Sequence, residues 1–336
     1  MTRVLSEGFE MKDLVGLSLY DCGISATARS GASSLFLSSG NSWLILPVSD
    51  LSELYFRTGY RYYSSSVNAS YFSIEFRNGT TILCSVRCGM VVPNIKASLL
   101  VGSTTVDTGA MSLIQSTWYS LEVRIKIDDA SGEFELKVDG TSECSFSGDT
   151  KPGADTVIDN IHIRLYRSDA TISAYLDDIA INDTAGGVDD SWCGDGRIIV
   201  IKPNGDTATL DLTPSAAVDH YTLVDDIPAD GDTTYVEGSV DDEEDIYDME
   251  ACGLSEVIIN RIWTEARAKD TASSGKSIAL ITKASGGAEV SGGDVALVGS
   301  YTKKLLGAEQ LVNPVDSAAW EVADIDALQG GPRTRP

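Results

Sequence analysis

Carboxylates that share one face of a predicted strand are the first residues in this sequence that could do chemistry. Glu133 and Glu135 flank Phe134, and Asp139 follows further along. Hydrolysis of a glycosidic bond uses two such carboxyl groups, one as acid and the other as nucleophile or base. Lys137 takes the next position on the same face, so the set is incomplete. We interpret the two glutamates as a solvated strand face and predict no catalytic residue and no enzyme.

A second group of oxygen-bearing side chains surrounds a predicted strand end and the turn after it. It comprises Asp177, Asp178, Asn182, Asp183, Asp189 and Asp190. Such oxygens are the ligands that calcium prefers, which makes Asp177, Asp178 and Asp183 calcium candidates. The spacing matches no EF-hand loop, and turns use the same residue types for their own backbone hydrogen bonds. We favour the turn interpretation and predict no required metal or cofactor.

An acidic block forms a third candidate site, in this case for a protein partner. It consists of Asp241, Asp242, Glu243, Glu244 and Asp245, and the range 203–260 around it contains no Lys or Arg. Consecutive residues of an extended chain point in opposite directions, so the block does not suit a metal cage. It suits either a solvated loop or a surface that attracts basic residues of a neighbour. We predict that it makes assembly contacts.

The composition limits the classes of partner. Fifty acidic residues against 25 basic ones give a formal net charge of −25, which opposes direct binding to nucleic acid or to an anionic membrane. No apolar run reaches the roughly 20 residues of a membrane helix, and residues 1–23 lack the apolar core of a secretory signal. The six cysteines are widely spread, and the two histidines, His162 and His220, have no Cys-x-x-Cys partner. We therefore predict free thiols, no zinc site, and folding in the cytosol.

The elements that would position these residues are predicted to be strands. Apolar and polar residues alternate over 119–128 and again over 134–138, with turn residues between them, so the two segments predict an antiparallel hairpin with one wet face. Further strands are predicted over 51–63, 71–77, 82–86, 97–101, 157–166 and 171–181. This spacing is typical of an all-β domain.

The best predicted domain boundary follows Gly186 and Gly187, where the charge pattern changes. We place the first domain at 1–188, an acidic β-rich assembly domain at 189–330, and a loose tail at 331–336. In the second domain we predict strands over 197–201, 221–224 and 235–238. We also predict a hairpin of 257–267 with 278–282, and one short helix over 318–328.

The order of these strands resembles concanavalin A-like lectin/glucanase sandwiches, with their jelly-roll topology. The resemblance is carried by a strand led by Trp118, a Val138-Asp139-Gly140 turn, and a strand with Tyr175-Leu176-Asp177-Asp178-Ile179. It looks like the version in virion structural proteins of tailed bacteriophages, and it continues through residues 192–197, 202–206, 232–236, Asn313-Pro314 and Trp320. The resemblance implies a concanavalin A-like β-sandwich followed by a smaller β-rich domain. It does not by itself define a function.

The main hypothesis is therefore a non-catalytic structural component of a virion, located in the capsid, neck or tail. Its partners would be other virion proteins and copies of itself, as a homo-oligomer. The alternative is a carbohydrate-binding receptor-recognition module on the virion surface. In that module aromatic rings would stack on a glycan, and the candidates are Trp43, Tyr60, Tyr62 and Tyr63.

Overall fold

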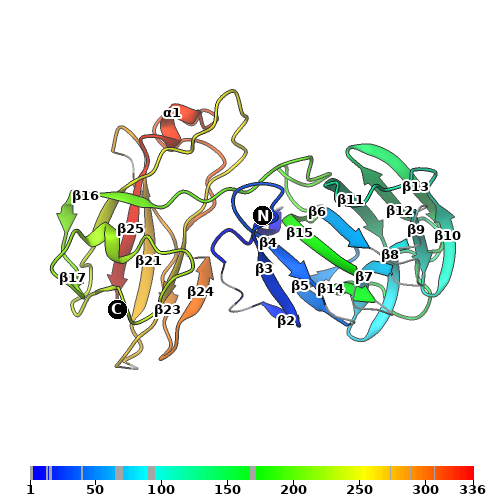
Figure 1. Cartoon of the computed structure of the whole chain (residues 1–336), viewed down its shortest axis with the longest axis horizontal. Helices are drawn as coiled ribbons and strands as arrows, with labels where there is room; N and C mark the ends of the chain where they lie inside the picture. Colours follow the sequence, from blue (N-terminus) through cyan, green and yellow to red (C-terminus); the bar gives the residue numbers. More distant parts are fainter. Residues whose placement is uncertain are drawn as a thin grey trace. The chain divides into compact units, whose positions relative to one another are not determined.

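The chain forms two compact units, residues 1–199 and residues 200–336, in a computed structural model. Figure 1 follows the chain from one terminus to the other. The structure describes residues 3–12, 14, 17–38, 41–64, 71–89, 95–166, 172–272, 274–287, 289–305 and 307–336. Both units are built almost entirely from antiparallel strands, which confirms the all-β fold class.

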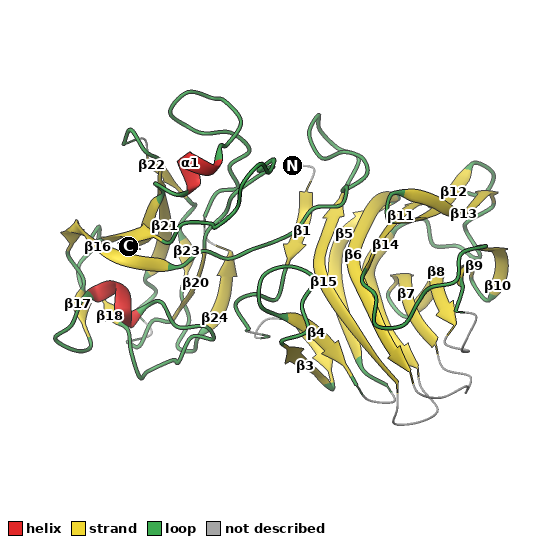
Figure 2. Ribbon diagram, turned by 45° about the horizontal axis from the view of Figure 1, so that its top comes forward, coloured by secondary structure: helices red, strands yellow, loops and turns green. Residues whose placement is uncertain are grey.

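The first unit is a sandwich of an eight-stranded and a seven-stranded antiparallel sheet. Figure 2 shows β15 and β6 side by side within the larger sheet. That sheet contains β1 (Arg3–Glu7), β3 (Cys22–Ser25), β4 (Ser34–Leu37), β6 (Glu53–Ser64), β11 (Tyr119–Lys126), β12 (Gly132–Val138), β13 (Thr141–Gly148) and β15 (Ile172–Asn182). The smaller sheet contains β2 (Ser18–Tyr20), β5 (Trp43–Leu51), β7 (Tyr71–Asn78), β8 (Thr81–Gly89), β9 (Ala97–Val101), β10 (Thr104–Thr108) and β14 (Ile158–Tyr166).

Apolar side chains from every second position of both sheets meet in one core. Aromatic rings connect the layers: Phe56 of β6 packs edge-on against Phe76 of β7, and Tyr60 of β6 stacks on Phe72 of β7 at 4.4 Å between ring centres. The order along the larger sheet is β13-β12-β11-β6-β15-β4-β3, with β1 also paired to β15. Along the smaller sheet it is β10-β9-β8-β7-β14-β5-β2.

The predicted hairpin is confirmed as β11 and β12, and the six further strands predicted between 51 and 181 correspond to β6, β7, β8, β9, β14 and β15. The predicted wet face of β11 is wrong in part, because Ser120 is fully buried and Glu122 is 4% exposed. A segment that follows β15 covers them, and the Gly194 N–H donates to Glu122 at 2.7 Å.

This covering segment, residues 189–198, explains where the units divide. The Ile198 N–H donates to Asp178 at 2.8 Å, and the Gly194 carbonyl accepts from the Arg57 guanidinium at 3.1 Å. The Trp192 ring lies against Tyr55 and under the Lys137 ammonium. We predicted a boundary after residue 188, whereas the first unit extends to Ile199 because these contacts bind the segment to its strands.

The second unit is centred on a six-stranded antiparallel sheet of order β16-β19-β25-β21-β22, with β23 also paired to β21. Its strands are β16 (Pro203–Leu210), β19 (Asp245–Met249), β21 (Ser277–Lys283), β22 (Glu289–Ser291), β23 (Val295–Ala296) and β25 (Gln329–Arg335). Two small sheets pair β17 (Thr213–Pro214) with β18 (Val236–Glu237) and β20 (Glu265–Ala268) with β24 (Thr302–Leu305). A 3₁₀ turn η1 (His220–Leu223) and a short helix α1 (Val322–Ile325) complete the unit.

The predicted tail at 331–336 is wrong, because these residues belong to β25 in the middle of the sheet. Their glycines allow this placement: a Cβ on Gly331 would lie 1.9 Å from the Asp245 carbonyl oxygen, and one on Gly330 would lie 2.8 Å from that of Ile281. The predicted strand 278–282 and the short helix are present as β21 and α1.

The remaining strand predictions in this unit are largely wrong. β21 pairs with β25, β22 and β23, whereas β20 pairs with β24, so 257–267 is not its hairpin partner. Residues 197–201 are irregular, and 221–223 belong to the 3₁₀ turn. Of 235–238 only Val236–Glu237 is a strand. Short isolated bridges, such as Ile259 with Trp320, replace long strands here.

All six cysteines are free thiols, as the sequence predicted. Among the described residues no helix has both the length and the apolar character that crossing a membrane requires.

Candidate functional site

The side of the smaller sheet that points away from the core carries polar and aromatic residues beside Ile45, Pro47 and Leu100, and we call the polar and aromatic set the polar face. It comprises Tyr20, Trp43, Tyr71, Ser73, Glu75, Arg77, Arg87, Asn160, His162, Arg164 and Tyr166. Strand alternation puts them there. On β14, for example, Ile161, Ile163 and Leu165 are fully buried in the core, so the residues between them point outward.

Cross-strand register brings these residues together from distant parts of the chain. Arg164 of β14 lies opposite Trp43 of β5 on one side and opposite Ser73 of β7 on the other. Ser73 in turn lies opposite Arg87 of β8. One row across four strands therefore carries an indole, two guanidinium groups and a hydroxyl, because directly opposed residues share a face.

Three rings form a ladder across β2, β5 and β14. Tyr20 stacks on Trp43 with 6.0 Å between ring centres, and Trp43 stacks on His162 at 6.3 Å with 11° between the planes. Tyr20 is 56% exposed, so the ladder is open to solvent at one end. Burial, aided by the charge of Arg77, lowers the pKa of His162 to about 4, and the imidazole is therefore neutral at pH 7.

A buried carboxylate anchors the centre of the polar face. Glu75 is 2% exposed and accepts hydrogen bonds from the Ser73 hydroxyl at 2.9 Å and from Arg77 Nε at 2.9 Å. The Tyr166 hydroxyl donates to the same carboxylate at 3.1 Å. Burial and the nearby Glu75 charge raise the pKa of Tyr166 to about 12, so it stays a donor. In all three contacts the Glu75 carboxylate is the hydrogen-bond acceptor.

Two arginines enclose a pair of tyrosine rings. The Arg87 guanidinium lies 4.4 Å from the centre of the Tyr71 ring, Tyr71 stacks on Tyr166 at 4.5 Å, and Arg164 lies 4.4 Å from the Tyr166 ring. The Nε atoms of both arginines are buried, and within the described part of the chain neither has a hydrogen-bond partner. The Asn160 Oδ1 atom of the same face shares this property. Buried polar atoms without partners are rare in folded proteins, and three of the nine found in the described residues lie on this face, which makes it a candidate place for a ligand.

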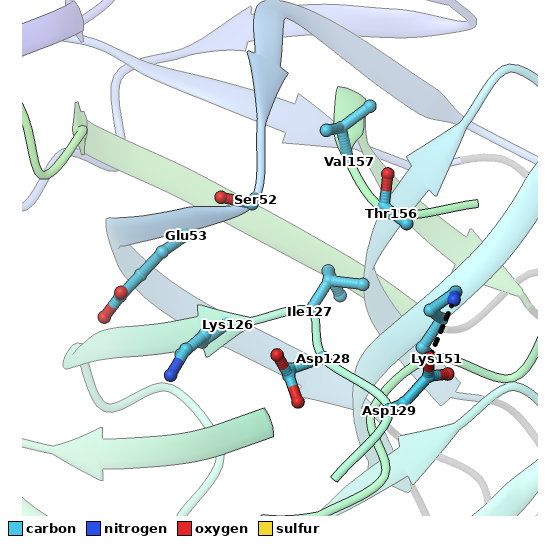
Figure 3. A pocket seen from close by; sticks show the side chains of 9 residues that line it. All are labelled: Ser52, Glu53, Lys126, Ile127, Asp128, Asp129, Lys151, Thr156 and Val157. Atoms are coloured by element: carbon cyan, nitrogen blue, oxygen red, sulfur yellow. Dashed lines mark hydrogen bonds and ion pairs between the residues drawn. The ribbon is translucent and has the colours of Figure 1, made fainter. Parts of the chain in front are cut away.

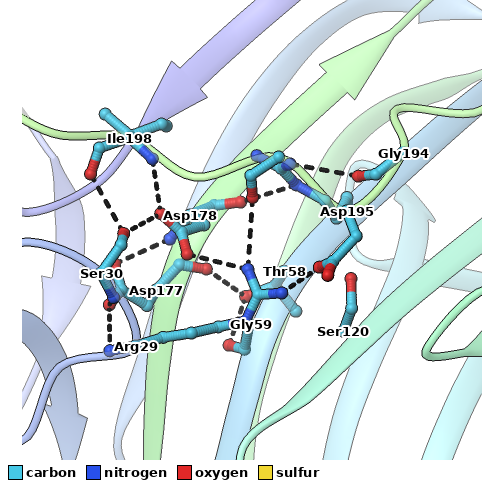
Figure 4. A network of polar contacts seen from close by, with 12 residues as sticks. Arg29, Ser30, Thr58, Gly59, Ser120, Asp177, Asp178, Gly194, Asp195 and Ile198 are labelled. Atoms are coloured by element: carbon cyan, nitrogen blue, oxygen red, sulfur yellow. Dashed lines mark hydrogen bonds and ion pairs between the residues drawn. The ribbon is translucent and has the colours of Figure 1, made fainter. Parts of the chain in front are cut away.

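A second polar cluster, which we call the Asp177–Asp178 network, lies on the larger sheet (Figure 4). Both carboxylates are fully buried. Asp177 accepts from the backbone N–H groups of Arg29 at 2.7 Å and of Asp178 at 2.8 Å. Asp178 accepts from the Ser30 hydroxyl at 2.5 Å, from the Ile198 N–H at 2.8 Å and from Arg29 Nη1 at 2.9 Å.

The cation in this network is Arg29. Its guanidinium also pairs with Asp195, and it passes so close to β6 that a Cβ on Gly59 would lie 2.6 Å from Arg29 Cδ. Every oxygen of the two aspartates accepts a hydrogen bond from a donor of the chain, and the absence of a required metal stays a prediction. Burial, and next the Asp178 charge, raise the pKa of Asp177 to about 7.

The third calcium candidate, Asp183, accepts from the Ala185 N–H at 2.9 Å, which is the turn role that we favoured. No group of three or more His, Cys, Asp or Glu side chains with a metal-binding arrangement occurs in the described residues.

The predicted glycan-stacking residues separate into two sets. Tyr60 and Tyr62 are 0% and 2% exposed and belong to the core, so no sugar ring can reach them, and these two assignments are wrong. They face inward because every second residue of β6, these two included, points toward the core. Trp43 lies on the polar face, and Tyr63 is 46% exposed on the other sheet. The sequence therefore identified one residue of the ladder.

Residues of the acidic block are engaged within their own unit. Asp241 pairs with Lys276, Asp242 with Arg335 and Glu244 with Arg333, while Glu243 accepts from the N–H groups of Ser239 and Val240. Asp245 is fully buried and accepts from Leu212 N at 2.9 Å and from the Tyr247 hydroxyl at 2.8 Å, with His220 Nδ1 at 2.7 Å. The basic partners come from outside 203–260. The assembly role remains a prediction, but Asp245 at least is not available to a neighbour.

A pocket of about 350 Å³ lies at the ends of the hairpin strands (Figure 3). Its lining includes Glu53, Lys126, Asp128 and an ion pair of Asp129 with Lys151 at 3.1 Å. N–H groups of the turn, led by Ser131, lower the pKa of Asp128 to about 2. Glu133, the proposed strand-face residue, pairs nearby with Arg124. Asp129 pairs with Lys151, Glu53 pairs with Arg124, and Asp128 accepts from its own turn, which is ordinary surface structure.

Sequence reasoning missed most of the polar face. A signal was present in 158–166, where His162, Arg164 and Tyr166 alternate with core residues. A merely solvated strand face is usually richer in Lys, Glu or Thr, so large aromatic and guanidinium side chains at successive outward positions indicate a recognition surface.

Comparisons with known proteins identify no family. No family model matches the chain, and no curated protein matches it. Among solved structures, a cellulose-induced protein, Cip1, has 15% identity and a TM-score of 0.43 over 57% of this chain and 100% of its own. A carbohydrate esterase from the Shiga toxin-encoding bacteriophage phi24B has 13% identity and a TM-score of 0.42 over 54% and 98%. The carbohydrate-binding module CBM66 from Bacillus subtilis has 9% identity and a TM-score of 0.35 over 50% and 96%. At these values the function has to be argued from the residues of this chain.

Proposed function

We propose that the first unit binds a carbohydrate on the polar face. The observation that carries this proposal is the set of buried unpartnered atoms, Arg87 Nε, Arg164 Nε and Asn160 Oδ1, beside the aromatic ladder. A sugar offers hydroxyl groups, which donate and accept, and an apolar ring face, which stacks on aromatic side chains. The polar face supplies hydrogen-bonding groups for the hydroxyls and aromatic rings for the apolar face of the sugar.

We propose binding without catalysis. Glu75 is the only carboxylate among the residues that define the polar face, and it is engaged with Ser73, Arg77 and Tyr166. Glycoside hydrolysis uses two carboxyl groups that flank the bond, so this face lacks the second one. The proposal thus adopts the receptor-recognition alternative and moves its centre from Tyr60 and Tyr62 to Trp43, Tyr20 and His162.

The test uses the full chain on a glycan array, followed by calorimetric titration of the glycans that bind. Trp43→Ala should weaken binding at least about tenfold, which equals about 1.4 kcal/mol. Tyr63→Ala is the matched control, because it removes an exposed aromatic ring from the other sheet. Absence of any bound glycan, or a loss in the control but not in Trp43→Ala, would refute the proposal.

The virion role rests on the sequence resemblance alone and stays a proposal, as do assembly with other virion proteins and a homo-oligomeric state. It is compatible with carbohydrate binding at a particle surface. An electron-microscopy map of an intact tailed-phage particle would test it: the polar face should be open to solvent. A polar face packed against neighbouring proteins would favour a purely structural component.

A further inference from the structure

We infer that the carbohydrate bound by the polar face is anionic, with carboxylate or sulfate groups held by Arg87 and by Arg164. This inference rests on the proposed function and adds the chemical class of the sugar.

The two arginines stand on either side of one residue. Ser73 of β7 lies opposite Arg87 of β8 and opposite Arg164 of β14. Two strand spacings separate the arginine backbones, which is about 10 Å. The two tyrosine rings lie between the guanidinium groups, so a sugar chain that crosses this row can bring one acidic group to each arginine.

Both guanidinium groups are held in place before any ligand binds. Each lies 4.4 Å from the centre of a tyrosine ring, and the two rings, Tyr71 and Tyr166, stack on each other at 4.5 Å. Stacking on an aromatic face fixes the plane of a guanidinium without using its N–H donors. The donors stay available for a planar or tetrahedral oxyanion.

The charge of these arginines is not balanced within the described residues. Arg29, Arg77, Arg124, Arg333 and Arg335 each pair with a carboxylate. Arg87 and Arg164 have no such ion pair among the described residues, although the chain has twice as many acidic as basic residues. A protein of net charge −25 that keeps two uncompensated cations together has a local positive potential, which attracts an anion.

Sugar hydroxyls alone could accept from the guanidinium N–H groups but would leave both charges uncompensated. Guanidinium groups bind carboxylate, sulfate and phosphate oxygens through short, charge-assisted hydrogen bonds, often two at a time. The polar face holds three guanidinium groups against the single carboxylate of Glu75, and that carboxylate is bound to Arg77. An acidic sugar therefore fits the face better than a neutral one.

The test compares matched pairs of ligands on the full chain. The probes are an oligogalacturonate and its methyl ester, sialyllactose and lactose, and a sulfated oligosaccharide with its desulfated form. The charged member of at least one pair should bind about tenfold or more tightly, and its affinity should fall as salt rises. The carboxylate and sulfate pairs show which oxyanion the face takes.

Variants identify the groups responsible. Arg87→Gln and Arg164→Gln should each reduce the affinity for the charged sugar at least fivefold and leave the neutral member nearly unchanged. Arg164→Lys should recover only part of the loss, because an ammonium keeps the charge but lacks the planar fork. Arg61→Gln is the matched control, since Arg61 also lies over a tyrosine ring, but on the other sheet and with its Nε bonded to the Ser116 carbonyl.

Equal binding of charged and neutral members, or charge selectivity that survives both arginine variants, would overturn this inference and leave carbohydrate binding intact. Failure of every glycan to bind would instead refute the proposed function. Circular dichroism of each variant distinguishes a lost contact from a lost fold.

Discussion

The polar face and the Asp177–Asp178 network are two polar clusters of one β-sandwich, and they differ in how completely their bonds are made. In the network each carboxylate oxygen accepts from a donor of the chain, and Arg29 supplies the cation. On the polar face two guanidinium Nε atoms and an amide oxygen are buried without partners. Both contain charged residues on strands, so residue type does not distinguish them.

This difference gives a criterion for function. A cluster whose bonds are closed within the chain stabilises the fold and has nothing left for a ligand. A cluster with open, fixed donors carries a desolvation penalty until a ligand arrives. We therefore expect variants of the network to lose stability, and variants of the polar face to lose binding.

The largest effect is expected from Asp178→Ala. Arg29 would keep its guanidinium, 7% exposed, without its buried partner and with only the exposed Asp195 as a counter-charge. Breaking a buried ion pair costs about 3–5 kcal/mol. Urea unfolding of the first unit, followed by near-ultraviolet circular dichroism, measures this loss. Asp183→Ala, which removes one turn hydrogen bond, is the control and should cost about 1 kcal/mol or less. Equal losses in the two variants would contradict the criterion.

The acidic block extends the comparison to the second unit. Asp245→Asn keeps the shape of the side chain but places an NH₂ group where Tyr247 and His220 now meet Oδ2. Loss of hydrogen bonds to this buried charge should destabilise the unit by about 2–3 kcal/mol. Asp242→Asn, at an exposed ion pair with Arg335, should cost about 0–1 kcal/mol. Thermal unfolding of both variants decides whether the block is mainly a structural element.

The two clusters should respond to pH with opposite signs. The pKa of Asp177 rises from 3.8 to about 7 in the fold, so its stabilising contribution is present at low pH and is lost as pH rises toward 7. The pKa of His162 falls from 6.5 to about 4, so its contribution is present above pH 6.5 and is lost as pH falls toward 4.

Urea midpoints between pH 5 and pH 7 test these signs. As pH rises from 5 to 7, the free energy of unfolding of Asp177→Asn should fall less, or rise more, than that of the unchanged protein. The free energy of unfolding of His162→Gln should rise less, or fall more, over the same range. If both variants change the pH dependence of the free energy of unfolding in the same direction, the fold does not shift the two pKa values in the way proposed.

The smallest effect on stability is expected from Arg87→Ala and Arg164→Ala. Each variant loses a cation–π contact worth about 0.5–1 kcal/mol, and each removes a buried unpartnered donor whose desolvation costs about 1–3 kcal/mol. The removed penalty is at least as large as the lost contact, so the unfolding free energy should not fall. A loss as large as that of Asp178→Ala would show that these arginines hold the fold together.

The sequence predicted the strands of the first unit well, because alternation along 119–138 and 157–181 reflects one apolar core. It predicted β25 badly, because Gly330, Gly331 and Pro332 are poor strand formers. The two glycines occur here because the neighbouring backbone comes very close. For the site, alternation shows which residues point outward but not what covers them. Ser120 and Glu122 point outward and are buried, and whether Arg87 and Arg164 have partners depends on contacts between strands distant in sequence.

The central position of β25 also affects the order in which the second unit folds. β19 and β21 pair with β25 and not with each other, so neither half of the sheet is complete without residues 329–335. The ribosome delivers β19 and β21 first, and their edges stay open until the later strand arrives. Open edges invite pairing with other nascent chains. The range 203–260 contains no Lys or Arg, so we expect its negative charge to repel other copies during this interval and to disfavour such pairing.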